Sequence, residues 1–180
     1  MMASDVSGRL ALLEARVSLL ERRVRREGGS QKAAVGPAGS PTAPIAYSVD
    51  QPGLIISDAY EIERDQSGRL FCWVGGAERV QFVFPHNADR RQLCCLHLQP
   101  HPQVDFGKMR VVVNDESQKH LLVPAADNLM QLKFPVEDVG APNINVLLLN
   151  LRGIRPEECG ENDDGRLVTA RFYGAEFADA

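Results

Sequence analysis

The sequence has few aromatic residues and no long apolar run. Phe, Trp and Tyr make up 6% of its 180 residues, and Trp73 is the single tryptophan. No apolar stretch approaches the roughly 18 residues that suggest a membrane-spanning helix. Charged residues also interrupt each apolar stretch near the N-terminus, which argues against a secretory signal. We therefore expect a cytoplasmic protein that has no membrane partner.

Cysteine and net charge are low as well. The four cysteines form no Cys-x-x-Cys pair and no zinc-knuckle spacing, so we expect free thiols and no metal or other cofactor. A net charge of −4 argues against a general polyanion binder. The basic cluster at 22–26 complements the C-terminal dipole of a helix and has no interleaved aromatic residue. No nucleic-acid partner is expected.

An amphipathic pattern runs through residues 1–27. Apolar side chains recur there in alternating steps of four and three, at Val6, Leu10, Leu13, Val17, Leu20 and Val24. This heptad seam predicts an α-helical coiled coil. Arg9 and Arg16 fall at g positions, where they face the e-position Glu14 and Glu21 of a parallel neighbouring helix. The simplest neighbour is another copy of the chain, so we expect a parallel homo-oligomer.

The number of chains in this oligomer has a separate signal. The string Arg-apolar-x-x-apolar-Glu occurs at 9–14 and again at 16–21. It resembles the short trimerisation motif of parallel three-stranded coiled coils, and Leu12 and Leu19 widen the apolar face. Valine at a with leucine at d favours two strands instead. We expect a trimer; a dimer, a tetramer and a helix docked on its own domain stay open as alternatives.

The remaining sequence divides into a linker and one larger domain. Residues 28–45 are rich in Gly, Ala, Ser and Pro and predict a flexible linker. Residues 46–180 change to short alternating runs, which predict strands at 54–62, 69–74, 78–84, 92–99, 109–114, 119–123, 129–136, 145–151 and 167–177. Turn signals such as 114–117 separate these runs. The domain is thus expected to be mainly β, an antiparallel, jelly-roll-like β-sandwich.

Two segments of this domain carry a resemblance to a known family. They comprise 58–63 with 68–75, and 147–160 with 163–167. Together they resemble a jelly-roll domain appended to bacterial glycosyltransferases and other polysaccharide-biosynthesis proteins, over about residues 54–178. In that domain an aromatic-x-x-Glu strand precedes a Phe-Arg-Trp-type strand, and an Asp-x-Arg-x-Leu-Gly turn leads into the last strand; here Val168 stands in place of that glycine. The resemblance implies a role in glycan metabolism.

The candidate carbohydrate-binding residues come from these segments: Trp73, Tyr60, Glu61, Glu63, Asp163, Asp164 and Arg166. An aromatic ring can stack on a sugar face, although a lone tryptophan in a strand is more often a packing residue. For the two glutamates the alternative is a solvated strand face. For the aspartates and Arg166 it is a capped turn, or a Ca²⁺ site.

These observations favour a non-catalytic, oligomeric accessory protein of polysaccharide or glycan metabolism that binds carbohydrate through several β-sandwich heads. One alternative is a scaffold whose sandwich binds a protein such as a glycosyltransferase. Another is a trimeric phage or surface adaptor head. A glycoside hydrolase needs only two suitably spaced carboxylates, but a 135-residue sandwich with few aromatic residues offers little wall for its cleft.

Overall fold

The computed structural model describes residues 43–76, 78–86, 90–137, 142–161 and 163–180, all within the compact unit Thr42–Ala180. The coiled-coil residues 1–27 and the linker up to residue 42 lie outside the described residues. Parallel oligomerisation through the seam from Val6 to Val24 therefore stays a prediction. The strand β1 (Ile45–Ser48) begins at the last residue that the sequence assigned to the linker.

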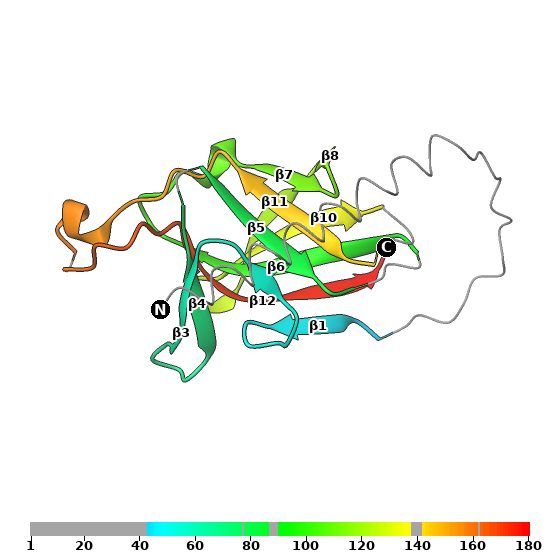
Figure 1. The fold of residues 1–180 in the computed structure, drawn as a ribbon, viewed down its shortest axis with the longest axis horizontal. Coiled ribbons are helices and arrows are strands. Elements are labelled where there is room, and N and C mark those ends of the chain that lie inside the picture. Colours follow the sequence, from blue (N-terminus) through cyan, green and yellow to red (C-terminus); the bar gives the residue numbers. More distant parts are fainter. Residues whose placement is uncertain (1–42, 77, 87–89, 138–141, 162) are drawn as a thin grey trace, which may run out of the picture. The chain divides into compact units, whose positions relative to one another are not determined.

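Two antiparallel sheets form a sandwich, which confirms the expected mainly β architecture (Figure 1). Sheet A has the order β3 (Ala59–Arg64), β4 (Leu70–Val74), β12 (Ala170–Asp179), β6 (Gln92–Pro100), β10 (Met130–Val136) and β9 (Leu121–Pro124), with β1 also paired to β12. Sheet B has the order β2 (Ile55–Ile56), β5 (Arg79–Phe84), β11 (Ile144–Leu149), β7 (Arg110–Val113) and β8 (Glu116–Gln118). The chain crosses repeatedly between the sheets, as in jelly-roll-like sandwiches. The 3₁₀ helices are η1 (Phe106–Lys108), η2 (Ala126–Asn128) and η3 (Pro156–Cys159).

The core lies between the sheets and follows the period-two alternation of the strands. Its largest fully buried side chains include Phe82, Phe84, Phe134, Phe172 and Phe177. The rings of Phe82 in sheet B and Phe172 in sheet A lie 4.8 Å apart and join the two layers. None of the described helices is long and apolar enough to cross a membrane.

One strand prediction and one turn prediction were wrong in a way that the backbone explains. The expected strand 54–62 is divided between the sheets, because Asp58 has a left-handed backbone (φ 55°) between β2 and β3. The turn expected at 114–117 is shorter than that. Asn114 and Asp115 alone turn the chain with φ angles of 47° and 70°, and Glu116 already pairs with Val113 in β8.

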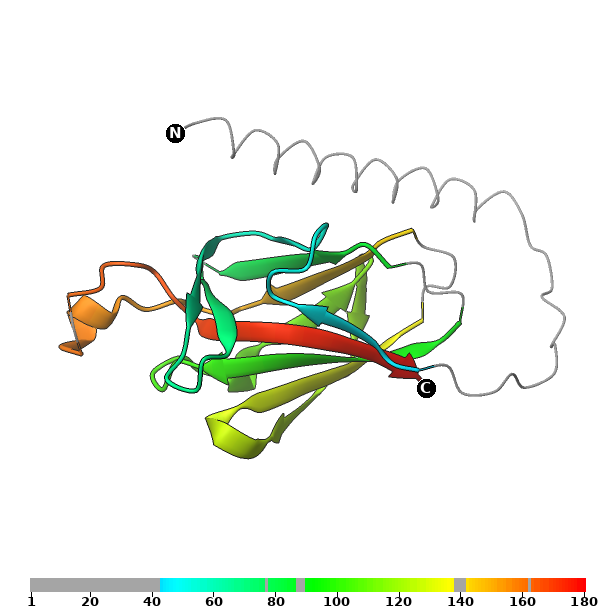
Figure 2. The same cartoon turned by 90° about the horizontal axis from the view of Figure 1, so that it is seen from below.

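A bulge in β12 lets this strand pair with two different strands along one of its edges. Phe172 pairs with Leu98 and Gly174 pairs with His97, so the register shifts between them. Before the shift β12 pairs with β4, and after it with β1. A Cβ at Gly174 would lie 2.5 Å from the backbone oxygen of Tyr47, so only glycine fits this close approach. Figure 2 shows β12 in red, and the orange segment that carries η3 projects from one end of the sandwich.

Candidate functional site

Trp73 lies on the outer face of sheet A and not in the core. Along β4, Cys72 and Val74 point into the hydrophobic core, and Phe71 and Trp73 therefore point to the opposite face. Trp73 is half-buried, whereas only 3% of Phe71 is exposed. The outer side chains around Phe71 must therefore cover it.

Those covering side chains are arginine and aromatic residues from β4, from β12 and from the position just before β4. The guanidinium carbon of Arg171 lies 4.8 Å from the centre of the Phe71 ring and 4.7 Å from that of Trp73. Arg69 lies 5.1 Å over Tyr173, whose ring is 5.7 Å from that of Phe71. These separations suit cation–π and aromatic contacts. The layer holds Trp73 in a fixed orientation on a surface that faces away from the core.

A row of polar groups continues across the sheet from Trp73. Arg171 pairs in register with Trp73 on β4 and with Gln99 on β6. Arg171 Nη1 donates a hydrogen bond of 3.2 Å to Gln99 Oε1, and the hydroxyl of Tyr173 donates one of 3.1 Å to the same oxygen. Burial raises the pKa of Tyr173, so this hydroxyl keeps its proton. The guanidinium is thus oriented by its strand, two rings and a neutral amide.

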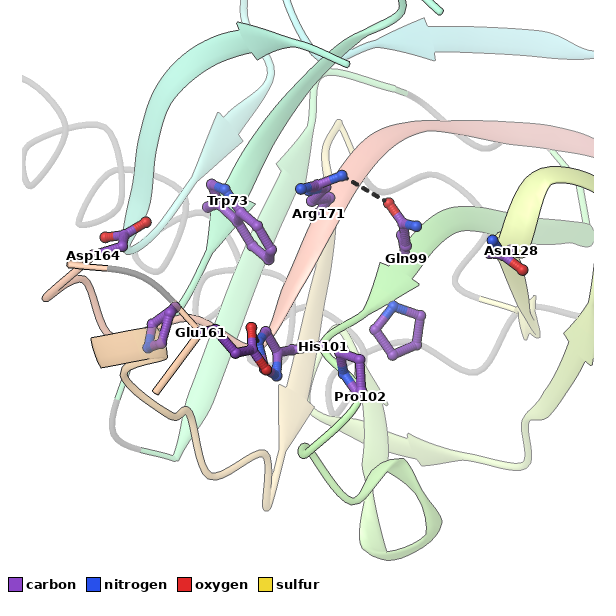
Figure 3. Close-up of a pocket in the computed structure, with 10 residues that line it drawn as sticks. Trp73, Gln99, His101, Pro102, Asn128, Glu161, Asp164 and Arg171 are labelled. Carbon is purple, nitrogen blue, oxygen red and sulfur yellow. Dashed lines mark hydrogen bonds and ion pairs between the residues drawn. The ribbon is translucent and has the colours of Figure 1, made fainter. Parts of the chain in front are cut away.

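A pocket of about 350 Å³ opens beside this row (Figure 3). Its lining includes Trp73, Gln99, His101 and Arg171 from the sheet and its strand ends, Asn128 from η2, and Pro156, Glu161 and Asp164 from the segment before β12. The volume is at the lower end of the range for ligand pockets in proteins. Asn128 has a left-handed backbone (φ 60°), a conformation that asparagine adopts more readily than most residues. Strands and connecting segments therefore line the pocket together.

His101 holds one wall of the pocket in place. Its ring is 4% exposed, and its Nδ1 accepts a hydrogen bond from the backbone N–H of Gln103 at 3.3 Å. That leaves Nε2 as the N–H, which lies 3.0 Å from Glu161 Oε2 and donates to it. The exposed carboxylate of Glu161 is thereby fixed at the mouth of the pocket.

Arg166 ties a second carboxylate to the neighbouring strand. Its Nε and Nη2 donate to Asp164 at 2.9 and 2.7 Å, and its Nη1 donates to Glu63 at 2.6 Å. Its guanidinium carbon lies 5.3 Å from the centre of the Tyr60 ring. The Tyr60 hydroxyl accepts from the N–H of Leu167 at 3.0 Å. The hydrogen bonds from Arg166 lower the pKa of Asp164, which keeps that carboxylate ionised.

The structure brings some of the predicted site residues together and leaves others apart. Tyr60, Glu63 and Asp164 all contact Arg166, and Asp164 also lines the pocket with Trp73. Asp164 additionally accepts from the backbone N–H of Arg166, as the capped-turn alternative expected. The remaining two residues, Glu61 and Asp163, are exposed and do not line the pocket.

The sequence did not predict several of the residues that line the pocket. Arg171 and Gln99 become neighbours of Trp73 only through strand pairing, and no local motif signals that pairing. Arg171 alternates with the buried Phe172, so its outward position on the last strand could have been predicted. His101 lies between two prolines, and Glu161 comes from a segment far along the chain. Among the described residues, no group of three or more His, Cys, Asp or Glu side chains could hold a metal ion.

Comparison with known proteins found a similar structure but no similar sequence. No family model matches the sequence, and no curated protein sequence matches it. Among solved structures, a family 35 carbohydrate binding module from Clostridium thermocellum is similar, with a TM-score of 0.46 and 13% sequence identity. The similarity covers 77% of this chain and 100% of that one.

Proposed function

We propose that this protein is a non-catalytic carbohydrate-binding protein whose sugar site is the pocket beside Trp73. The observation that carries the proposal is the position of that ring. Trp73 is half-buried on an outer sheet face, fixed by Arg171 and Phe71, and it forms one wall of a pocket. The C–H groups on a pyranose face pack on such a π surface, so the ring can hold a sugar without closing over it.

The polar groups of the pocket suit sugar hydroxyls, each of which both donates and accepts. Arg171 and Gln99 provide side-chain N–H donors from the strands. Asp164 and Glu161 provide carboxylate acceptors from the segment before β12. A sugar ring lying on Trp73 would therefore have donors toward the strands and acceptors toward the segment.

The same carboxylates argue against glycoside hydrolysis. A hydrolase needs one carboxylic acid that keeps its proton near neutral pH, which requires a raised pKa. Asp164 has the opposite character, because hydrogen bonds from Arg166 lower its pKa. Glu161 is held by a hydrogen bond of 3.0 Å from Nε2 of His101. Both groups are suited to accept hydrogen bonds from a bound sugar.

A glycan array followed by calorimetry on the full-length protein tests the sugar site. Trp73→Ala should weaken binding of the retained glycan by about 10- to 30-fold, the loss expected for an aromatic contact at the centre of a site. Leu121→Ala is the matched control, because Leu121 is 61% exposed and lies on β9 at the other edge of sheet A. It should leave affinity within about twofold. Equal affinity of Trp73→Ala and the unmodified protein would overturn the proposal.

We propose further that residues 1–27 of several chains form one parallel coiled coil, which links their β-sandwich domains. We also propose that the protein acts in polysaccharide metabolism. Weak contacts at each head would then add through avidity on a repetitive glycan. Sedimentation should show an oligomer at micromolar concentration, and removal of residues 1–27 should release monomeric, folded heads. An unchanged number of chains after this deletion would contradict the coiled-coil proposal and leave the sugar site unaffected.

A further inference from the structure

Arg171 differs from the neighbouring described arginines in the charge of its partners. Arg166 and Arg69 each contact a carboxylate. Arg171 donates to the amide oxygen of Gln99 and lies in hydrogen-bonding range of the Tyr173 hydroxyl, and both groups are neutral. Among the described residues, no carboxylate forms an ion pair with Arg171.

The surroundings of Arg171 make this missing counter-charge costly. The guanidinium lies against the rings of Phe71 and Trp73, which take the place of water on its faces. Its Nε is buried and has no hydrogen-bond partner among the residues that the structure describes. A buried donor without an acceptor destabilises a protein, more so when the group is charged. A ligand that supplies negative oxygen atoms would offset this cost, and a neutral sugar would do so only in part.

The position of Arg171 also limits how it could find a counter-charge within the protein. Its strand is paired on both sides, with Trp73 on one side and Gln99 on the other. Its guanidinium also packs against the rings of Phe71 and Trp73. The guanidinium is therefore held in place before a ligand arrives, which reduces the entropy lost on binding.

We infer that the pocket takes an acidic sugar, whose anionic oxygen atoms bind Arg171 while its ring lies on Trp73. This inference rests on the proposed function and names the ligand class of the same site. The planar guanidinium matches two oxygen atoms of a carboxylate, or two of a sulfate ester. On the opposite side, Asp164 and Glu161 repel an anion and accept hydroxyl groups. These two sides set one orientation of the sugar, with its acidic group toward β12.

The test compares oligomers that differ mainly in whether they carry an anionic group and in which group that is. The full-length protein is titrated with a hexuronic acid oligomer, the methyl ester of the same oligomer, a neutral hexose oligomer and a sulfated hexose oligomer. We expect the acid to bind at least 10-fold more tightly than its methyl ester. Added salt should weaken binding of the acid and leave the ester almost unchanged. A sulfated oligomer that binds while the hexuronic acid fails would support the anion site and assign the anion to sulfate.

Variants at Arg171 show whether this side chain binds the anionic group of the sugar. Arg171→Gln should bring the affinity for the acid down to that of the ester and change the ester affinity by less than threefold. Arg171→Lys keeps the charge without the planar fork and should fall between the two. Arg110→Gln is the control, because Arg110 is an exposed arginine on β7 of sheet B. Thermal unfolding of each variant checks that its fold is retained.

The failures of the two proposals can be told apart. If the acid and the ester bind equally, and Arg171→Gln weakens both alike, the acidic-sugar inference is wrong and the sugar site stands. If no oligomer or array glycan binds the unmodified protein, both proposals fall. If both Arg171 variants fail to fold, the comparison of acid with ester on the unmodified protein decides alone.

Discussion

Replacing Arg166 with methionine should loosen the segment before β12 and leave the sandwich intact. The arginine joins Asp164 of that segment to Glu63 of β3 through charged hydrogen bonds. Methionine has a similar length and can still cover the ring of Tyr60, so the change removes mainly the charged contacts. The Tyr60 hydroxyl would still bond the backbone of Leu167.

The size of the effect follows from the exposure of the groups. The Arg166 side chain is 31% exposed, and those of Glu63 and Asp164 are 39% and 21% exposed. A fully exposed ion pair contributes about 0.2–1 kcal/mol, and a buried hydrogen bond to a charged group about 1.5–3 kcal/mol. Two half-exposed contacts, one of them bidentate, should together contribute about 2 kcal/mol. That energy corresponds to about a 30-fold change in the local opening equilibrium.

Hydrogen–deuterium exchange measures this opening directly. The N–H of Leu167 donates to Tyr60, and the N–H of Glu157 donates to the backbone oxygen of Asp164 at 3.2 Å. Both amides should exchange about 30-fold faster in Arg166→Met, whereas amides in the middle of β6 should change by less than about threefold. Unchanged exchange at Leu167 would refute the reasoning. Equal acceleration across β6 would show that Arg166 supports the whole fold.

The matched control uses another arginine of the same segment. Arg155 pairs with Glu158 at 3.0 Å, but the two side chains are 48% and 61% exposed. Such an exposed pair contributes little, so Arg155→Met should leave the exchange pattern almost unchanged. If it accelerates Glu157 as much as Arg166→Met does, the segment is loosened by any loss of charge.

Acid should remove the difference between Arg166→Met and the unmodified protein. Hydrogen bonds from Arg166 lower the pKa of folded Asp164 below its unfolded value. For a carboxyl with a lowered pKa, the stabilisation is fully present above the unfolded value, near pH 4, and is lost as pH falls through the folded value. The exchange rates of the two proteins should therefore converge as the pH falls below the folded pKa of Asp164. A constant difference to below that pKa would contradict the assigned linkage.

Two further predictions concern the core and the thiols. Trp73→Ala should lower the free energy of unfolding by about 1–2 kcal/mol, because the ring lies on an outer face. Phe172→Ala in the core should lower it by about 3–5 kcal/mol. Denaturant titration measures both losses, and equal losses would mean that Trp73 is a core residue. At about pH 8, a thiol reagent should modify half-buried Cys159 and spare Cys72 and Cys94 until the protein is denatured. Burial raises the pKa of Cys72 to about 12 and that of Cys94 well above its ordinary value, so rapid modification of either in the folded protein would contradict the buried positions.

The sequence predicted the strands well where alternation was regular. Val80, Phe82 and Phe84 alternate along β5, and all three are buried in the core. Alternation gave no warning of the break at Asp58, because aspartate is tolerated in a left-handed backbone without a glycine or proline to mark it. The bulge at Gly174 was missed for a related reason, since a single glycine within a strand is only a weak signal.

The candidate site was predicted only in part, and its physical origin explains which part. Short motifs identified Trp73, Asp164 and Arg166, because each lies near a recognisable turn or strand. Arg171 and His101 belong to the site through strand register and a contact between distant segments. Neither register nor distant contacts leave a local pattern in one sequence.

The two sides of the pocket are held by different kinds of structure, and this difference has a consequence for binding. Trp73 and Arg171 lie on paired strands, so the stacking surface and the cation keep their geometry without a ligand. Asp164 and Glu161 lie on a connecting segment that side-chain contacts from Arg166 and His101 fix to the sandwich. In the proposed site, loosening that segment would leave the stacking surface intact and add an ordering cost to each hydrogen bond from a sugar. The paired strands would then set where the proposed acidic sugar binds, and the segment would set how fast it dissociates.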